Sequence, residues 1–562
     1  MKENSIHKVP RTPDSNKLSS FIARKQKYFA KCNKCSHNST NLRYYYDYLW
    51  SNYQKMQKLD KILVSKKDLK KEPEINMYLN NLDTCEFHYK RDQYKSKFIT
   101  ILKMLYSDYQ HILTKLFLEF NFTDSEEKDV RSFLQKIKSN SLSEEEVIEW
   151  VNKQGVKLAR SIYICMLEKK LPSNIIAFFG QTPEIYGQFT SLDIQKDIEL
   201  NLQNANQYLF QLSNNQDIDI KLDLTVHSRS SNYNLKDRML DRIFFLHYLT
   251  KNNKIHLTVW NSDKKKMLDF DRKDRYIGPK EINSGCTTFM GDNKVSIWRK
   301  EELNKVIMHE IFHSVELEQK GNLNELNDFI YHHFDIRKEN NKFNFFESYV
   351  ETFADIINVF LITAETFNYS IEKTKRLLYG GKKKKYVTIK KNKLTKNKIT
   401  KTNLTKTNLT KTVNNIDHER LVMFYDLIWI ETGWVLFQAA KVLHYFGYHN
   451  FEQFYFSKGI KEDKKSKNYL QKSNVFSYII VRSLIFFKLD EFLKMCRENN
   501  NNKPLQHNIP NSEMIKFMES VLKDKNYTLT INKMLELVRE MSKKKKHSLV
   551  YSSMRMTCIE YK

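Results

Sequence analysis

The chain has 562 residues and a net charge of +28, and it is too long for one hydrophobic core, so we expect two or three packed units. Apolar residues make up 41% of it, with only 12 Gly and 8 Pro, which favours long helices over many short strands. Seven cysteines exclude a disulfide framework, and no run of about 18 uncharged apolar residues predicts a membrane span, so we expect a soluble, intracellular protein without a membrane partner.

The N-terminal part divides into two predicted regions. Residues 1–30 are largely polar and predict a disordered arm. Residues 31–214 carry long apolar-periodic runs and predict a helical N-terminal domain, in which Ser143 and Glu146 form a capping box at the start of a helix.

A mixed pattern covers residues 215–379. Apolar residues alternate from Ile218 to Val226, as in a half-buried strand. Further strands are predicted at Lys254–Trp260 and Val295–Arg299, with helices at Asn234–Leu249 and from Lys300 onward. The order strand, helix, strand, strand, helix predicts an α+β subdomain within a mostly α chain.

Residues 380–416 form a low-complexity insertion rich in Lys, Thr and Asn, which cannot bury enough apolar surface to order itself. Between Lys382 and Thr412 it holds 12 Lys and no acidic residue, or 12 of the 28 net charges. Nucleic acid is therefore a possible partner only through non-specific binding to this insertion. Residues 417–562 predict a helical C-terminal subdomain that ends in a short strand, Ser553–Glu560.

The motif His309-Glu310-Ile311-Phe312-His313 has the form His-Glu-x-x-His. On a helix, the i, i+4 spacing puts both imidazoles on one face, within reach of one tetrahedral zinc ion. Apolar residues at Leu303, Ile307, Ile311 and Val315 form the opposite stripe. The pattern predicts zinc ligands at His309 and His313, with Glu310 as the general base for a water molecule that the zinc ion activates.

Three acidic residues follow on a segment that is otherwise apolar. Glu347, Glu351 and Asp355 lie at i, i+4 and i+8, where like charges repel and burial is costly without a compensating cation. The bare spacing lets either Glu347 or Glu351 be the third zinc ligand.

With these residues, Asp217–Phe360 resembles the gluzincin metallopeptidases, which pair His-Glu-x-x-His with a later Glu-x-x-x-Asp helix. Glu351-Thr352-Phe353-Ala354-Asp355 matches that second motif. The resemblance implies a zincin-like catalytic subdomain at 215–379 with Glu351 as third ligand and Glu347 as the alternative. It also implies that Asp355 orients a ligand histidine from outside the metal's own ligands.

A wider resemblance, from about Thr287 to the C-terminus, is to the zinc peptidases encoded by nucleocytoplasmic large DNA viruses. It is carried by Val295–Glu302, Met308–His313, Glu347–Phe360, Asn474–Ser483 and Ser553–Thr557. It implies a viral zinc metallopeptidase in the host cytoplasm or the virion, acting on a polypeptide substrate. A Gly-x-Met-Glu-Asn segment of the aminopeptidase branch is missing from the sequence, so we expect an endopeptidase.

Other residues are candidates for substrate binding or for a second metal site. Tyr478 is a candidate oxyanion donor, with His444 as an alternative, and the Val295–Arg299 strand is a candidate edge for an extended peptide. Cys32-x-x-Cys35 with Cys85-x-x-His88 could hold a structural zinc, but the 49 residues between the pairs favour free thiols, and Cys286 is discounted as a ligand because Glu is available. The alternatives to a peptidase are an inactive zinc-site scaffold and a basic nucleic-acid-binding virion protein.

Overall fold

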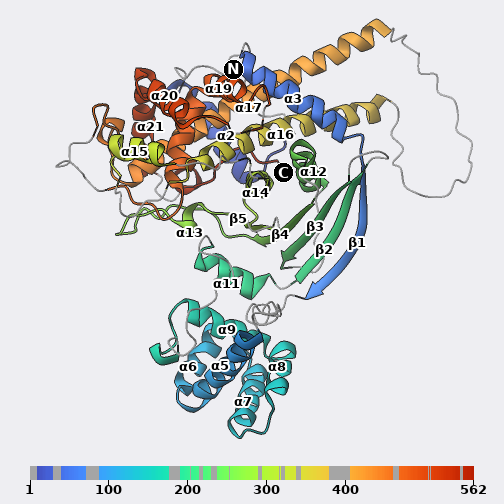
Figure 1. The fold of residues 1–562 in the computed structure, drawn as a ribbon, viewed down its shortest axis with the longest axis vertical. Coiled ribbons are helices and arrows are strands. Elements are labelled where there is room, and N and C mark those ends of the chain that lie inside the picture. The colour runs from blue at the N-terminus through green and yellow to red at the C-terminus, as the bar shows by residue number, and fades with distance from the viewer. Residues whose placement is uncertain are drawn as a thin grey trace, which may run out of the picture.

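One six-stranded mixed sheet lies at the centre of the structure, with most of the helices on one side of it (Figure 1). The strand order is β1-β2-β3-β4-β6-β5. The strands are β1 (Asp60–Lys70), β2 (Asn204–Ser213), β3 (Asp219–Ser228), β4 (Lys254–Ser262), β5 (Gly285–Thr288) and β6 (Lys294–Arg299). Strands β3, β4 and β6 are parallel to one another, whereas the β1–β2, β2–β3 and β5–β6 pairs are antiparallel.

This computed structural model describes residues 9–29, 39–70, 88–175, 190–202, 204–213, 219–229, 237–251, 254–288, 294–315, 317, 323–336, 343–378, 406–459, 468–503, 505–506, 508–544 and 548–561. The predicted insertion lies outside these residues up to residue 405, and so do Cys32, Cys35 and Cys85.

The helices divide between two hydrophobic cores. The larger core, above the sheet in Figure 1, is built by α2 (Pro13–Arg24), α3 (Thr40–Met56), α12 (Asp237–Thr250), α13 (Pro279–Ile282), α14 (Leu303–Ser314), α15 (Asn324–His333), α16 (Phe346–Leu378), α17 (Lys406–Tyr445), the π-helix η5 (Phe476–Val481), α18 (Arg482–Phe487), α19 (Leu489–Asn499), α20 (Asn511–Leu522), α21 (Lys525–Lys544) and α22 (Leu549–Ser552). The smaller core belongs to α5 (His88–Ser107), α6 (Gln110–Glu119), α7 (Asp124–Lys138), α8 (Glu144–Lys153), α9 (Val156–Leu167) and α11 (Leu192–Asn201). Short 3-10 helices cover η1 (Gln26–Tyr28) and η3 (Phe451–Gln453).

The mostly helical α+β class is confirmed, and the predicted strands correspond to β3, β4 and β6. The capping box of Ser143 and Glu146 is present at the start of α8. Strand β6 has neighbours on both sides, so the prediction that Val295–Arg299 is a free edge is wrong, and β5 ends the sheet order instead.

Three predicted boundaries are wrong. The arm at 1–30 contains α2, whose Leu18 and Ile22 are fully buried in the larger core. The helical domain at 31–214 gives β1 and β2 to the sheet and α3 to the larger core, because the buried face of α3 carries Tyr45, Tyr46 and Tyr53. The C-terminal helices share the larger core as well, so 417–562 is not a separate subdomain.

The predicted strand at Ser553–Glu560 is an irregular segment instead. It makes an isolated bridge between Ser553 and Met267, and side chains hold much of its backbone. Glu431 accepts hydrogen bonds from the Cys558 and Ile559 N–H groups at 3.2 and 2.9 Å. Because side chains satisfy these groups, the segment is buried without a strand partner.

Within the described ranges, one helix is long and apolar enough to span a membrane. It is the Asp417–Tyr445 part of α17, and 89% of its most apolar window is buried inside the protein. Asp426 and Glu431 are themselves buried there. The burial is that of a core helix.

Candidate metal centre

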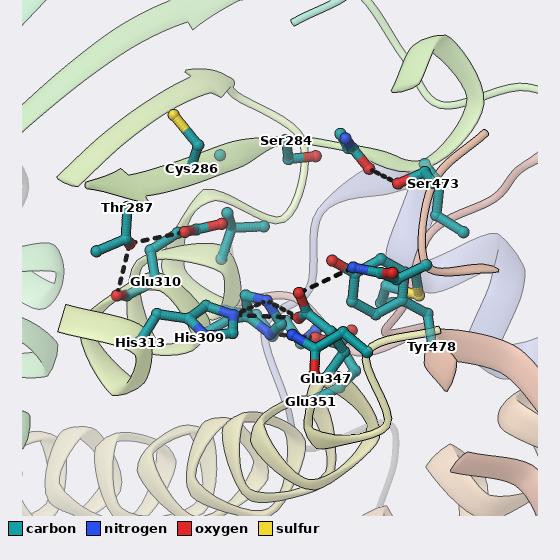
Figure 2. Close-up of a pocket in the computed structure, with 18 of the residues that line it drawn as sticks. Ser284, Cys286, Thr287, His309, Glu310, His313, Glu347, Glu351, Ser473 and Tyr478 are labelled. Atoms are coloured by element: carbon teal, nitrogen blue, oxygen red, sulfur yellow. Dashed lines mark hydrogen bonds and ion pairs between the residues drawn. The ribbon is translucent and has the colours of Figure 1, made fainter. Parts of the chain in front are cut away.

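Helices α14 and α16 bring the predicted residues together in one cavity (Figure 2). Helix α14 follows β6 directly and starts after Glu302, which has a left-handed backbone conformation with φ of 59°. Its residues from Lys305 to Ser314 are all buried. The cavity has a volume of about 220 Å³ and lies between these two helices, β5 and the start of η5.

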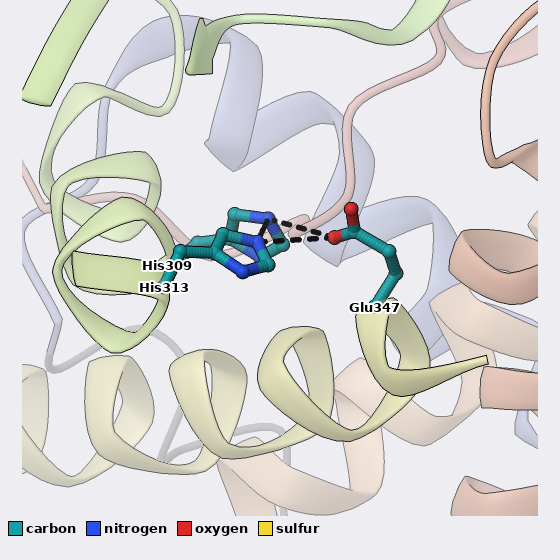
Figure 3. Close-up of side chains that lie close together, drawn as sticks. All are labelled: His309, His313 and Glu347. Atoms are coloured by element: carbon teal, nitrogen blue, oxygen red, sulfur yellow. Dashed lines mark hydrogen bonds and ion pairs between the residues drawn. The ribbon is translucent and has the colours of Figure 1, made fainter. Parts of the chain in front are cut away.

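Three side-chain atoms form a compact triangle, which Figure 3 shows. His309 Nε2 lies 2.9 Å from His313 Nε2, and Glu347 Oε2 lies 3.3 Å from the first nitrogen and 3.1 Å from the second. Ligand atoms about 2.0–2.1 Å from a tetrahedral zinc ion are about 3.3–3.4 Å apart. The triangle is thus slightly tighter than a zinc site and has the right donor chemistry, two imidazoles and one carboxylate.

The carboxylate that completes the triangle is that of Glu347, the predicted alternative, and not that of Glu351. Glu351 Oε2 lies 2.7 Å from Nδ1 of His309, on the far side of the imidazole from the triangle. A carboxylate there fixes the ring orientation and its tautomer. Glu347 thus lies where Glu351 was predicted, and Glu351 contacts a histidine where Asp355 was predicted to do so.

Asp355 contacts cations instead of a histidine. Arg482 Nη2 lies 2.8 Å from Asp355 Oδ2, and Arg482 Nη1 lies 3.3 Å from Glu351 Oε1. Lys305 forms an ion pair with Glu351 and lies 4.0 Å from Asp355. All four side chains are at most 3% exposed, and the two cations lie against both acidic residues. Burial nevertheless outweighs Arg482 and Lys305 at Asp355 and raises its pKa to about 8. The sequence predicted zinc as the compensating cation, whereas Lys305 and Arg482 lie against Glu351 and Asp355.

Opposing effects set the charge states of the two glutamates. Burial favours a protonated Glu351, but Lys305, His309 and Arg482 outweigh burial and hold its pKa well below the usual range. Burial acts in the same direction on Glu347, and His313 and His309 outweigh it and lower its pKa. Both carboxylates are therefore ionised at neutral pH.

The pKa of His309 is strongly raised. Burial lowers its pKa, but the charge of Glu351 and the hydrogen bonds to Glu347 and Glu351 outweigh burial and raise the pKa to about 10. A metal ion at its Nε2 would have to displace this proton.

Glu310 contacts β5 beside the triangle. Thr287 Oγ1 lies 2.9 Å from both the backbone carbonyl oxygen and Oε2 of Glu310. Burial raises the pKa of Glu310, and the neighbouring histidines and the Thr287 hydroxyl offset part of that rise. The carboxyl group thus lies beside the triangle without contributing one of its three atoms.

Two residues from the η5 region contact Glu347. Asn474 Nδ2 donates to Glu347 Oε1 at 3.1 Å, and the ring centroid of Tyr478 lies 5.9 Å from that of His309. Burial, followed by the charges of Glu347, Glu310 and Glu351, raises the pKa of Tyr478 well above 10. Its hydroxyl stays protonated and is hydrogen bonded to Glu347, so Tyr478 lines the cavity and the oxyanion role stays a prediction.

Other candidates are not part of the centre. His444 packs against Phe270 and Tyr551, outside the residues that line the cavity. Cys286 lines the cavity, but burial and the charge of Glu310 raise the pKa of its thiol to about 12, which disfavours the thiolate a metal needs. The Cys32–His88 site has three of its four residues outside the described ranges.

Sequence reasoning missed four residues of the site. Lys305 precedes His309 by one helical turn, and Arg482 is a lone charge in an apolar run, so both had a visible signal. Thr287 and Gly285 had none, because β5 is only four residues long. Comparisons of the chain with protein-family models, with curated proteins and with solved structures find no match.

Proposed function

We propose that the protein is a zinc-dependent metallopeptidase with His309, His313 and Glu347 as metal ligands and Glu310 as general base. The observation that carries the proposal is the triangle of 2.9, 3.1 and 3.3 Å between two imidazoles and one carboxylate, with a second carboxylate beside it. The gluzincin resemblance supports the same chemistry, although its Glu-x-x-x-Asp motif, Glu351–Asp355, lies one helical turn after the carboxylate of the triangle.

A bound zinc ion would supply Lewis-acid polarisation of the scissile carbonyl and lower the pKa of a water molecule. Glu310 takes the proton of the attacking water and returns it to the leaving amine. Burial favours this second step, because it raises the pKa of Glu310 and makes the protonated form accessible. Glu351 keeps His309 oriented, and Lys305 and Arg482 keep Glu351 charged.

Tyr478, whose hydroxyl is hydrogen bonded to Glu347, would turn that donor to the oxygen on which negative charge develops. Its ring lines the cavity opposite Glu310 in Figure 2, and its high pKa keeps the hydroxyl protonated. The polypeptide substrate would bind along β5, which ends the described sheet and borders the same cavity. A zincin-like arrangement, with an edge strand next to the metal-binding helix, is part of this proposal.

The test is a peptide-library cleavage screen analysed by mass spectrometry, with the wild-type protein and Glu310→Gln at equal zinc content. The wild type should cleave internal bonds, lose activity after chelation and regain it with zinc, while Glu310→Gln should bind zinc and cleave nothing. Zinc binding without cleavage by either protein would favour the inactive scaffold. Equal cleavage by both would remove Glu310 from the mechanism.

A further inference from the structure

We infer that Thr287 is a positioning residue for Glu310 and that β5 sets both the orientation of the base and the register of the substrate. The inference rests on the proposed function. It adds Thr287, which lies outside the His-Glu-x-x-His motif. It starts from two contacts of one hydroxyl group, both drawn in Figure 2.

The Thr287 hydroxyl holds Glu310 at two points. Its Oγ1 lies 2.9 Å from the carbonyl oxygen and 2.9 Å from Oε2 of the same residue. A hydroxyl has one proton and can share it between two acceptors, so it fixes the carboxylate relative to the helix backbone. This limits the rotamers of Glu310 without using a charged partner, which would compete for the proton that a base must carry.

Gly285 makes room for this arrangement. A Cβ atom at Gly285 would lie 2.7 Å from Glu310 Oε1, 2.8 Å from Cγ and 3.0 Å from Cδ. Residues two apart on a strand face the same side, so Gly285 and Thr287 both face α14. Gly285 leaves space for the Glu310 carboxylate, and Thr287 binds it.

Gly285 and Thr287 also direct their backbone N–H and C=O groups to the outer side of β5. Trp298 N–H donates to the Ser284 carbonyl at 2.9 Å, and the register pairs Cys286 with Ser296. Hydrogen-bonded and non-hydrogen-bonded pairs alternate in an antiparallel ladder, so Ser284 and Cys286 bond to β6. The N–H and C=O groups of Gly285 and Thr287 therefore point away from β6, to the side where no described strand pairs.

A peptide strand added to β5 would thus hydrogen bond to the residues that hold the base. If the peptide paired one residue out of register, its side chains would turn to the opposite face of the sheet. Its scissile carbonyl would also move relative to Glu310. The chemistry that this edge recognises is an extended polypeptide backbone of at least a few residues on both sides of the cleaved bond. Free dipeptides should be poor substrates.

The test compares full-length, zinc-loaded Thr287→Val and Thr287→Ser with the wild type. Valine keeps the branched shape but removes the hydroxyl, whereas serine keeps the hydroxyl. Thr287→Val should lower kcat by about 10- to 100-fold, a part of what a positioned base contributes, with little change in KM, zinc content or Tm. Thr287→Ser should restore most of kcat. Unchanged kcat in Thr287→Val, or a loss of zinc as large as the loss of kcat, would overturn the inference.

Gly285→Ala gives an independent test, because the added methyl group must displace Glu310. It should lower kcat at least as much as Thr287→Val. Gly278→Ala is the matched control, because its Cβ would meet its nearest atom at 3.4 Å, an ordinary contact, and kcat should not change.

Crystal structures of the wild type and Thr287→Val separate this inference from the proposed function. If the wild type cleaves no peptide, the proposed function fails, and the carboxylate position still decides the inference. The Glu310 carboxylate should leave its place in Thr287→Val, and an unmoved carboxylate would show that the hydroxyl does not position it.

Discussion

Replacing Glu347 and Glu351 separately by Gln should affect different properties of the protein, because the two carboxylates have different partners. Glu347 Oε2 is 3.1 and 3.3 Å from the two Nε2 atoms, whereas Glu351 Oε2 is 2.7 Å from His309 Nδ1. Glu347→Gln removes a metal ligand and should weaken zinc binding by more than about 100-fold. Glu351→Gln removes an orienting group and should weaken it by about 10- to 100-fold.

The loss of stability should instead be larger for Glu351→Gln than for Glu347→Gln. Glu351→Gln leaves the buried cations Lys305 and Arg482 with Asp355 as their remaining ion-pair partner within 4.0 Å among the described residues. Breaking a buried ion pair costs about 3–5 kcal/mol. The described partners of Glu347 are the two histidines, Asn474 and Tyr478, and the protonated His309 keeps Glu351 as a second carboxylate partner. Glu347→Gln should therefore cost the metal-free protein less.

Both quantities are measurable on the same samples. Zinc affinity comes from competition with a chromophoric chelator, and the free energy of unfolding of the metal-free protein comes from urea titration. Lys305→Met serves as the control, since it should lower stability through the same ion pairs while all three triangle atoms remain. The reasoning is refuted if Glu351→Gln loses more zinc affinity than Glu347→Gln while losing less stability.

Three further predictions concern other parts of the account. Zinc uptake at pH 7 should release a proton from His309, because its pKa near 10 keeps it protonated below that value; calorimetry in buffers of different ionisation enthalpy should show the release, with affinity falling by about tenfold per pH unit on acidification. Ile22→Ala should cost about 2–4 kcal/mol in urea unfolding, because Ile22 is fully buried in the larger core, and a neutral result would restore the reading of 1–30 as a separate arm. Deleting Lys382–Thr405 should leave Tm and zinc affinity nearly unchanged, because its polar repeats have no core-forming pattern, and a large drop in Tm would contradict this.

The motif helix was predictable because its information is local. The spacing of His309 and His313 places both on one face of α14, and the strand before it has a clear period-2 pattern. Strand β2 also carries an alternating signal, in Tyr208, Phe210 and Leu212. Strand β1 had little signal, because Lys and Asp interrupt its apolar residues.

The third ligand was not predictable from local spacing. Glu347 and Glu351 are four residues apart, about 6 Å along α16, and both have an acid four residues later. Which of the two glutamates faces the Nε2 atoms of His309 and His313 depends on the axial position of α16 relative to α14. That register is set by packing and by Arg482, which comes from a segment more than a hundred residues away and pairs with Glu351 and Asp355.

The central claim is that one zinc ion binds between α14 and α16. The most direct measurement is a crystal structure of the zinc-loaded protein with anomalous data collected on both sides of the zinc absorption edge. The account predicts one strong zinc peak within bonding distance of His309 Nε2, His313 Nε2 and Glu347 Oε2 together. A peak coordinated by Glu351 in place of Glu347, or no peak at this triangle at saturating zinc, would contradict it.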